Sequence, residues 1–211
     1  MPWTRARFCV LDLETTGLDP KRDEIISFGA VPVDEGRAHP ADAVHFLAKP
    51  RRPINPGSVK IHTIRDCDLQ NQPPLQERLQ EIRSAVEGRF LVAHSAWLDA
   101  AFLAKAFKGQ PAFPRAMIDT AQLATKSMEC PPLGTADISL EYASTMLNLP
   151  VHAPHTALGD AMTTAQLFLA LAHRLSRNEV VSVADLHDLS RRQPLPWHQH
   201  LPPALKFGLG Q

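Results

Sequence analysis

The segment FCVLDLETTG at positions 8–17 constrains the fold of this chain more than any other part of the sequence. Its first four residues are apolar, and a continuous apolar run that ends in a turn is typical of a strand buried on both faces. The acids Asp12 and Glu14 follow at the carboxyl end of this run. Because side chains alternate between the two faces of a strand, we expect both carboxylates on one face. The chain should therefore build a covered central sheet that presents two neighbouring acids.

The rest of the chain alternates between strand patterns and helix patterns. Further strands are expected at residues 25–33, 43–50 and 89–94, and at the start of residues 116–126. Apolar residues recur at helical spacing in later segments, which we expect to be helices: 75–86, 97–107, 138–149 and 156–175, with another at the end of 116–126. This order predicts an α/β fold, with a mixed central sheet and helices on both faces.

Two segments are expected to lack helices and strands. Residues 51–58 are rich in Pro, Gly and Asn, and residues 191–211 concentrate prolines without a helical period. The length of 211 residues and the hydrophobic content of 44% support one sizeable core. We therefore expect a single domain at residues 1–190 and a Pro-rich C-terminal tail at residues 191–211.

The cysteines and the apolar runs indicate the compartment. Cys9, Cys67 and Cys130 are odd in number and widely spaced, which fits neither a disulfide framework nor a zinc site. Reduced thiols are typical of cytoplasmic proteins. The N-terminal apolar run is shorter than a signal peptide requires, and no run approaches the ~20 residues that span a bilayer. We expect a cytoplasmic protein without a membrane partner.

The charge balance limits how the chain could bind nucleic acid. Lys and Arg together number 22, as do Asp and Glu, so the formal net charge is zero. This balance argues against the strong basic surface of proteins that grip duplex DNA along its length. It leaves open a nucleic-acid partner held through bound cations, because divalent ions invert the field around a cluster of acids.

Three further residues could complete a set with Asp12 and Glu14. Asp99 lies early in the helix that follows strand 89–94, and Asp160 lies in the first turns of the last long helix. His155 precedes that helix. Each has an ordinary explanation when taken alone, because acids near a helix N-terminus interact favourably with the helix dipole and a loop histidine can simply be solvated. A site follows only from their combination.

The combination resembles a known family. The segments DLETTGLDP, LVAHSAWLDAAFL and HTALGDAMTTAQLFLAL resemble the three exonuclease motifs of the DEDD family. Within that family they are most similar to the histidine branch (DEDDh), which includes the proofreading epsilon subunit of bacterial DNA polymerase III. The resemblance covers about residues 7–175, which is most of the chain.

The resemblance implies a ribonuclease H-like fold and a two-metal-ion 3′→5′ exonuclease. In that family the acids that correspond to Asp12, Glu14, Asp99 and Asp160 bind two divalent ions, Mg²⁺ or Mn²⁺, and the residue that corresponds to His155 is the general base. The residue types suit this chemistry, because hard cations prefer oxygen ligands and a pair of them can activate water and stabilise the leaving oxygen. The implied reaction releases nucleoside 5′-monophosphates from the 3′ end of single-stranded or frayed nucleic acid, with DNA favoured.

The resemblance also implies substrate contacts, and it shows departures from the family pattern. The implied contacts are Thr15, Thr16, Gly17, Leu18, His94 and Ser95. The second motif commonly reads H-N-A-x-F-D, whereas Ser95 and Leu98 stand here at the Asn and Phe positions. The segment IHTI at 61–64 is similar to a family segment usually read HGI, and the sequence assigns no consequence to its Thr63.

Several alternatives stay open at this point. The same acids serve exonucleases that trim RNA, and the contact to the 2′-hydroxyl that separates the two substrates is not visible in the sequence. A non-catalytic scaffold that binds nucleic acid or a polymerase is another alternative, and the tail at 191–211 is the candidate for contact with a polymerase or another protein. A phosphatase with an attacking Asp12 is less suited, because Glu14 is one methylene too long for the acid of its D-x-D-x-T loop.

Overall fold

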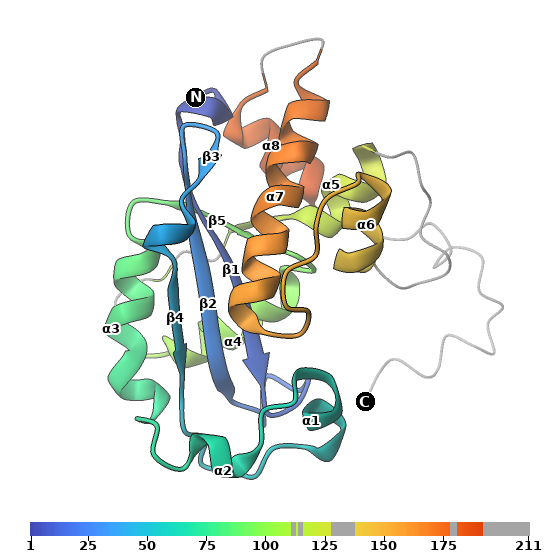
Figure 1. Cartoon of the computed structure of the whole chain (residues 1–211). Coiled ribbons are helices and arrows are strands. Elements are labelled where there is room, and N and C mark those ends of the chain that lie inside the picture. Colours follow the sequence, from blue (N-terminus) through green and yellow to red (C-terminus); the bar gives the residue numbers. More distant parts are fainter. Residues whose placement is uncertain (111–112, 114–115, 128–137, 178–180, 192–211) are drawn as a thin grey trace, which may run out of the picture.

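A computed structural model describes residues 1–110, 113, 116–127, 138–177 and 181–191 (Figure 1). The predicted tail lies outside the described residues apart from Arg191, and so does Cys130. The described chain contains a mixed sheet with helices on both faces, as the sequence predicts. None of the described helices is both long and apolar enough to cross a membrane.

The sheet is built around the acid-bearing strand. Within the described residues it has six strands: β1 (Arg7–Thr15), β2 (Ile25–Asp34), β3 (Arg37–Ala38), β4 (Val44–Leu47), β5 (Phe90–Ala93) and β6 (Met117–Asp119). β1 pairs antiparallel with β2 on one side and parallel with β5 on the other. β6 extends the sheet in parallel beyond β5, and β3 and β4 both pair antiparallel with β2. The first strand is therefore central.

Helices cover both faces of β1. They are α1 (Pro56–His62), α2 (Asp66–Leu69), α3 (Leu75–Val86), α4 (Trp97–Ala106), α5 (Thr120–Ser127), α6 (Leu140–Met146), α7 (Ala157–Leu175) and α8 (Val183–Ser190), with short 3-10 helices at Trp3–Arg5 and Pro40–Asp42. Phe8 and Val10 pack into a cluster with α5 to α8, whereas Cys9 and Leu11 pack into a cluster with α3 and α4. This alternation buries both faces of β1, as its apolar run predicts.

A glycine lets α7 approach the sheet beside the acids. Gly29 on β2 is the register partner of Asp12 on β1. A Cβ atom at Gly29 would lie 2.2 Å from the carbonyl carbon of Ala157, the first residue of α7. No side chain fits into that space, so any residue other than glycine would push the start of α7 away from the strands. The first turn of α7 therefore rests directly on the strand pair that carries Asp12.

The structure corrects the expectation that residues 51–58 lack regular structure. α1 begins at Pro56, because the Asn55 side chain accepts a hydrogen bond from the Gly57 N–H at 2.8 Å and proline is favoured at the first helical position. Three elements lie outside the predicted segments, namely β3, α2 and α8, and the helix expected at 138–149 is the shorter α6. α8 is marked by a capping box in which Ser182 and Asp185 exchange hydrogen bonds.

Thr63 has a structural consequence that its sequence context did not reveal. It ends α1 in the left-handed conformation, with φ of 61°, and its N–H donates to the Val59 carbonyl oxygen. A side chain in that region costs about 1–2 kcal/mol relative to glycine, and a β-branched one is especially disfavoured.

We therefore expect Thr63→Gly to raise the free energy of unfolding by about 1 kcal/mol. Urea denaturation followed by circular dichroism would measure it. Thr145→Gly is the matched control, because Thr145 is exposed within a regular helix, where glycine is expected to lower stability by a few tenths of a kcal/mol. Equal effects of the two substitutions would contradict the explanation by backbone strain.

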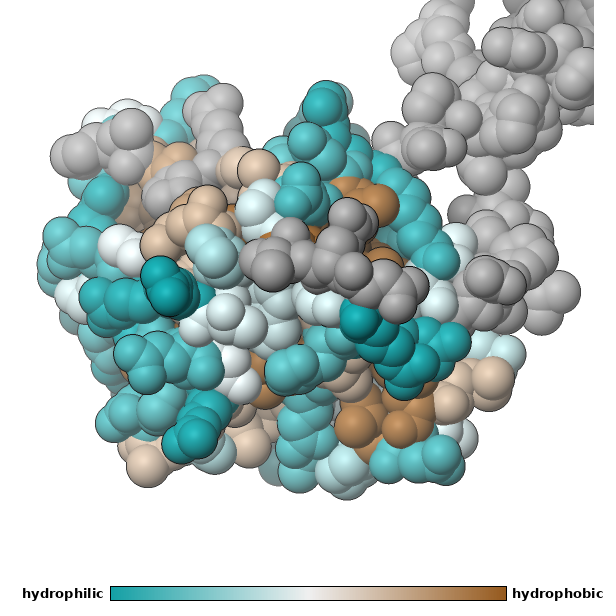
Figure 2. Space-filling view, turned by 90° about the horizontal axis from the view of Figure 1, so that it is seen from above, coloured by the Kyte–Doolittle hydropathy of each residue, from teal (hydrophilic) through white to brown (hydrophobic). Residues whose placement is uncertain are grey.

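The two ends of the sheet differ. The end toward which β1 runs carries α1 and α2 and the turn after Thr15 (Figure 1). The opposite end, with the N-terminus and β3, is seen from above in Figure 2, where hydrophilic residues cover most of the described surface and apolar areas are small. The features that point to chemistry lie toward the first end.

Candidate metal centre

Three acids from two elements meet on one side of the sheet. Asp12 and Glu14 come from β1, and Asp160 comes from the first turn of α7. Each offers a carboxylate oxygen, and these oxygens all lie within 4.8 Å of one another. Asp12 and Glu14 thus lie on the same face of β1, as the alternation of strand side chains predicts. Asp160 reaches them because Gly29 lets the start of α7 lie against the strands.

Asp99 lies beside this group. It belongs to the first turn of α4 and its side chain is buried. Burial raises the pKa of Asp12 well above its usual value, and the negative charge of Asp99 raises it further, followed by the charges of Glu14 and Asp160. All three other acids therefore act on Asp12, which makes it the central member of a four-carboxylate cluster.

The cluster is electrostatically strained without a cation. Burial raises the pKa of Glu14 to about 8, and the charge of Asp160 contributes to this increase. Burial also raises the pKa of Asp99. The pKa of Asp160 is raised to about 6, again mainly by burial, although a hydrogen bond from the His155 N–H lowers it in part. Buried like charges disfavour ionisation in this way unless a positive charge lies between them.

One oxygen of Asp160 indicates where such a charge would bind. Its Oδ2 accepts a hydrogen bond from the backbone N–H of His155 at 3.1 Å. Its Oδ1 is buried and has no hydrogen-bond partner among the described residues. A buried acceptor without a partner is costly. Because carboxylate oxygens are the ligands that Mg²⁺ and Mn²⁺ prefer, this group of oxygen donors fits a divalent metal site.

His155 lies at the rim of the cluster. Its side chain is 51% exposed, and its Nε2 lies 4.0 Å from Glu141 Oε1 on α6. Its backbone is left-handed, with φ of 60°. The loop that carries it is fixed to α7, because the His152 N–H donates to Thr163 Oγ1 at 2.9 Å. The backbone of His155 is thus attached to the cluster through Asp160, while its imidazole points to the surface.

The turn after β1 is shaped by the hydroxyl groups of its two threonines. Thr15 Oγ1 donates to the Gly17 carbonyl oxygen at 2.7 Å, and Thr16 Oγ1 donates to Asp23 Oδ1 at 3.1 Å. Both hydroxyls are therefore engaged within the protein. Leu18 follows with 71% of its surface exposed. A substrate at this turn would meet its backbone and Leu18 rather than the two hydroxyl groups.

The structure places His94 and Ser95 in a bracing role. The His94 ring contacts Thr120 Oγ1 through Nδ1 at 2.9 Å and the Ile138 carbonyl oxygen through Nε2 at 2.7 Å, so both ring nitrogens are engaged. Ser95 has φ of 54° and its N–H donates to Asp119 Oδ1 at 3.0 Å. Both residues link the end of β5 to neighbouring elements. Their contact with substrate, which the resemblance implies, stays a prediction.

Two residues that the sequence reasoning missed hold the site in place. The buried Asp119 accepts hydrogen bonds from the N–H groups of Ser95 and Ala96, directly before α4, and so fixes the start of the helix that carries Asp99. The signal was available, because Asp119 ends a predicted strand as Asp12 does. The second residue is the buried His62, whose Nε2 lies 3.3 Å from the Thr15 carbonyl oxygen.

The hydrogen bonds of His62 fix its protonation. Its Nδ1 accepts from the Ile64 N–H at 3.1 Å, so the proton of the neutral ring resides on Nε2 and is donated to Thr15. Burial lowers the pKa of His62, which favours this neutral form. α1 is thereby attached to the end of the acid-bearing strand.

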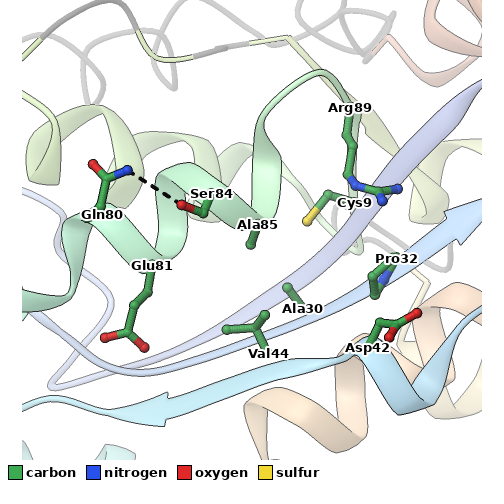
Figure 3. A pocket seen from close by; sticks show the side chains of 10 residues that line it. All are labelled: Cys9, Ala30, Pro32, Asp42, Val44, Gln80, Glu81, Ser84, Ala85 and Arg89. Atoms are coloured by element: carbon green, nitrogen blue, oxygen red, sulfur yellow. Dashed lines mark hydrogen bonds between the residues drawn. The ribbon is translucent and has the colours of Figure 1, made fainter.

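A cavity of about 510 Å³ lies between α3 and the strands (Figure 3). Its lining comes from α3, from strands β1, β2 and β4, from the 3-10 helix at Pro40–Asp42 and from the turn before β5: Cys9, Ala30, Pro32, Asp42, Val44, Gln80, Glu81, Ser84, Ala85 and Arg89. Cys9 and Asp12 project from opposite faces of β1. Burial raises the pKa of the Cys9 thiol to about 12, so it stays protonated and is a poor nucleophile. The chemistry therefore centres on the acids.

The raised pKa values predict how metal and pH affect stability. Glu14 and Asp160 have folded-state pKa values of about 8 and about 6, above those of an unfolded chain. In the absence of metal, proton binding by these two acids therefore stabilises the folded state in full below about pH 4. This stabilisation is lost as the pH rises through 6 to 8. In EDTA, Tm should fall between pH 5 and pH 8.

Divalent cations should reverse this trend, because they compete with protons for the same oxygens. Mn²⁺ at about 100 times its Kd should add ~2.7 kcal/mol to the free energy of unfolding at pH 8. Since each kcal/mol of added stability raises Tm by ~2–4 °C in a chain of this size, Tm should rise by about 5–10 °C. The shift at pH 5 should be much smaller. Thermal melts at both pH values measure it, with Asp188→Asn, a surface acid on α8, as the control. Equal shifts at pH 5 and pH 8 would exclude binding by these acids.

Comparisons with known proteins agree with this geometry. The RNase_T family, described as exonuclease, matches residues 9–168. The chain is 37% identical over 186 residues to a DNA polymerase III PolC-type protein of Thermotoga petrophila, covering 87% of this chain and 13% of that protein. It is 34% identical over 175 residues to the DNA polymerase III subunit epsilon of Treponema pallidum, covering 81% of this chain and 79% of the subunit. The chain thus spans only a small part of the PolC-type relatives.

Solved structures share the fold at low sequence identity. Exonuclease X in complex with 5′ overhanging duplex DNA has a TM-score of 0.64 at 23% identity, over 88% of this chain and 99% of that one. Exonuclease I of E. coli in complex with a dT13 oligonucleotide has a TM-score of 0.71 at 17% identity, over 82% of this chain and 42% of that one. The nuclease domain of 3′hExo, a DEDDh family member bound to rAMP, has a TM-score of 0.68 at 17% identity, over 82% of this chain and 94% of that one.

Proposed function

Since this chain belongs to the RNase_T exonuclease family and carries a DEDD 3′→5′ exonuclease domain, we propose that it removes nucleotides from the 3′ end of single-stranded DNA. The products are nucleoside 5′-monophosphates. The observation that carries this proposal is the cluster of Asp12, Glu14 and Asp160, in which Asp160 Oδ1 is buried without a partner among the described residues. Such a cluster suits cation-dependent hydrolysis of a phosphodiester better than it suits a passive surface.

We assign the cation ligands from the electrostatics of the cluster. Asp12 would be a ligand of the cations, because it belongs to the group of three acids and the charges of the other acids all raise its pKa. Glu14 and Asp160 would hold the cations together with Asp12, and Asp99 would contribute a further carboxylate beside them. Two Mg²⁺ or Mn²⁺ ions bound there would activate a water molecule and stabilise the charge on the leaving oxygen.

His155 is the proposed general base. An imidazole can take a proton from the attacking water near neutral pH. The ring Nε2 lies 4.0 Å from Glu141 Oε1. Because its side chain is half exposed, the ring can turn toward the acids when a scissile phosphate occupies the site. The hydrogen bond from its N–H to Asp160 keeps the residue within reach.

The turn after β1 is the proposed site of the terminal nucleotide. Thr15, Thr16 and Gly17 contribute their backbone, and Leu18 packs against the last base. The exposed side chains of Leu18 and Ile61 support this assignment, because both lie next to residues that contact the end of β1. Two apolar side chains of this kind suit contact with a base face rather than with phosphate.

DNA is the favoured substrate because both relatives described above are named as DNA polymerase III proteins, and two of the fold neighbours were solved with DNA. RNA trimming is the second candidate, supported by the fold neighbour that is bound to rAMP. We propose that the exonuclease domain occupies residues 1–190, a range that includes the last described helix, α8. We propose that the tail at 191–211 contacts a polymerase or another protein.

Degradation of matched oligonucleotides tests the function. The purified protein is incubated with 5′-labelled single-stranded DNA and RNA of one sequence, in Mg²⁺, Mn²⁺ or EDTA. We expect a ladder that shortens from the 3′ end, needs the cation and forms faster on DNA. Faster shortening of RNA would favour the exoribonuclease. Binding of the strands by folded protein without any shortening would favour the non-catalytic scaffold.

A further inference from the structure

We propose that Asp23 is a positioning residue for the 3′-terminal nucleotide: its carboxylate holds the turn at Thr16–Leu18 in the shape that receives the sugar and base. The inference rests on the proposed function and assigns the geometry of this turn to a residue outside the three motifs. Asp23 is half-buried and lies in the segment that leads from the turn into β2.

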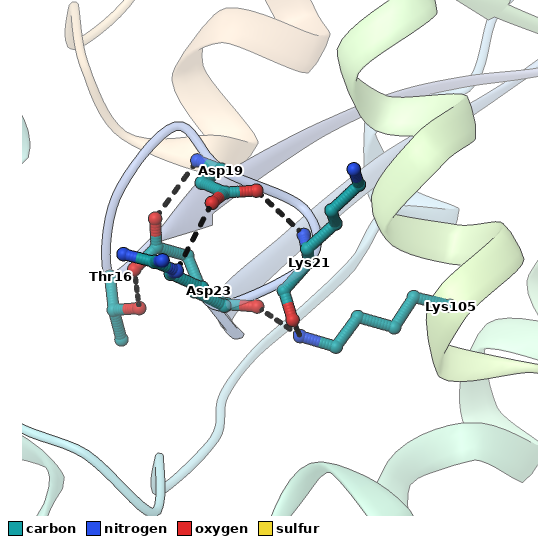
Figure 4. A network of polar contacts seen from close by, with 6 residues as sticks. Thr16, Asp19, Lys21, Asp23 and Lys105 are labelled. Atoms are coloured by element: carbon teal, nitrogen blue, oxygen red, sulfur yellow. Dashed lines mark hydrogen bonds and ion pairs between the residues drawn. The ribbon is translucent and has the colours of Figure 1, made fainter. Parts of the chain in front are cut away.

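The Asp23 carboxylate joins both sides of the turn (Figure 4). Its Oδ1 accepts a hydrogen bond from Thr16 Oγ1 at 3.1 Å, and its Oδ2 accepts one from the Asp19 N–H at 2.9 Å. Thr16 precedes Gly17 and Leu18, and Asp19 follows them. A single carboxylate therefore fixes the distance between the two ends of the exposed tip. Hydrogen bonds to a charged acceptor are stronger than those between neutral groups, which suits this role.

Gly17 packs directly on the same carboxylate. A Cβ atom at Gly17 would lie 2.4 Å from Asp23 Oδ2. The need for glycine here comes from this close approach, since Gly17 is not among the residues with positive φ. The path of the turn and the position of the Asp23 carboxylate therefore depend on each other.

A lysine attaches this assembly to the helix that carries Asp99. Lys105, in the last turn of α4, donates from Nζ to the Asp23 carbonyl oxygen at 2.7 Å (Figure 4). The Thr16 N–H also donates to the Glu24 carbonyl oxygen at 2.9 Å, and the Asn55 N–H donates to the Thr16 carbonyl oxygen at 2.8 Å. The turn is thus held against α4 and against the segment before α1. Asp23 is the only side chain in this network that bonds to both flanks of Leu18 among the described residues.

Asp23 is distinct from the cation ligands. It does not belong to the group of carboxylates that could hold a metal ion among the described residues, and both of its oxygens are engaged by the turn. Its loss should therefore loosen the surface that receives the terminal nucleotide and leave the acid cluster in place. A defect in binding, rather than in the chemical step, is the expected signature.

Steady-state kinetics of Asp23→Ala test this inference. We expect KM for a single-stranded oligonucleotide and the inhibition constant of thymidine 5′-monophosphate to rise roughly tenfold, as expected for the loss of hydrogen bonds to a charged group. We expect kcat to stay within about threefold of wild type, because groups that act equally in ground and transition states affect binding alone. The increase in Tm caused by Mn²⁺ should persist. Asp188→Ala is the matched control, because it removes an exposed acid on α8.

A second substitution separates the hydrogen bond from general loss of structure. Thr16→Val keeps the shape of the side chain and removes the hydroxyl that donates to Asp23. It should raise KM and the nucleotide inhibition constant in the same direction. The effects should be less than additive in the double variant, because both changes remove the hydrogen bond between Thr16 and Asp23, while Asp23→Ala alone also removes the acceptor of the Asp19 N–H and Thr16→Val alone also removes the acceptor of the Glu24 N–H. If Asp23→Ala shows no cooperative melt, Thr16→Val and Lys105→Met provide the same test.

The outcomes separate this inference from the proposed function. Active wild type whose KM and nucleotide inhibition are unchanged in Asp23→Ala and Thr16→Val would overturn the role of Asp23 and leave the exonuclease intact. A loss in kcat at constant KM would also overturn it. Wild type that shortens no strand in any cation would remove the proposed function, and with it the premise of this inference.

Discussion

Replacing Asp12 by asparagine is expected to reduce turnover by on the order of 10³-fold or more while the fold is kept. Cation-based stabilisation of charge contributes several kcal/mol to hydrolysis, and ~4 kcal/mol corresponds to about 10³ in rate. The charges of the other three acids all raise the pKa of Asp12, which places it among the proposed cation ligands, so its loss would weaken the metal site. Asparagine preserves the shape of the side chain and removes its charge. Initial rates on a labelled DNA strand would measure the effect.

The same variant should be more stable than wild type in the metal-free state. Removing one of several buried like charges relieves repulsion, so Tm in EDTA at pH 8 should rise. The increase in Tm caused by Mn²⁺ should shrink, because one ligand is missing. Asp188→Asn is the control, and it should match wild type in rate, Tm and response to Mn²⁺. Near-wild-type turnover of Asp12→Asn would show that the active site lies elsewhere.

Replacing His155 by alanine should lower kcat by roughly 10²–10⁴-fold, the usual contribution of a general base. His155 is at the rim of the acids and is not one of the grouped carboxylates, so the response of Tm to Mn²⁺ should be that of wild type. This combination distinguishes a base from a ligand. Asp12→Asn should lose both activity and the metal response, whereas His155→Ala should lose activity alone.

Added imidazole gives a sharper test of the base. The His155 side chain is 51% exposed, so its removal leaves a position that a small base can reach from solvent. Imidazole in the reaction should restore part of the lost rate in His155→Ala and should not restore Asp12→Asn. His187→Ala on α8 is the control, because it removes a partly exposed histidine remote from the acids. If kcat of His155→Ala falls by less than threefold, His155 is a surface residue of its loop and not the general base.

The sequence alone was sufficient to predict the central strand and to place Asp12 and Glu14 on one face of it. An apolar run buried on both faces and a period of two place Asp12 and Glu14 together without any knowledge of other segments. The helical period likewise predicts α7 and puts Asp160 near its start. Asp160 lies close to Asp12 and Glu14 because Gly29 lets α7 approach β2. A contact between these two elements leaves no periodic pattern in the sequence. Only the resemblance to a family implied that convergence.

Other features escaped because they depend on hydrogen-bond partners that are distant in sequence. The hydroxyl of Thr16 donates to Asp23, and the ring of His94 contacts Thr120 and Ile138, and neither pairing could be read from the sequence. The start of α1 was missed for a local reason, because Pro56 lies in a Pro/Gly/Asn-rich segment that predicts a loop, although proline is favourable at a first helical position. Propensity identifies elements well, and it says little about which side chains bond across them.

The position of the cavity shown in Figure 3 has a consequence for the design of inhibitors. Compounds chosen to fill the space between α3 and the strands would contact Cys9 on one face of β1, while the acids project from the other face. Such compounds could not compete with a nucleic-acid strand for the same position, so any inhibition should be independent of substrate concentration. A competitive inhibitor would instead need oxygen-rich groups that bind divalent cations together with a flat ring for the surface around Leu18. The shape of a cavity is therefore a poor guide for inhibitors of this protein, and the chemistry of its acids is a better one.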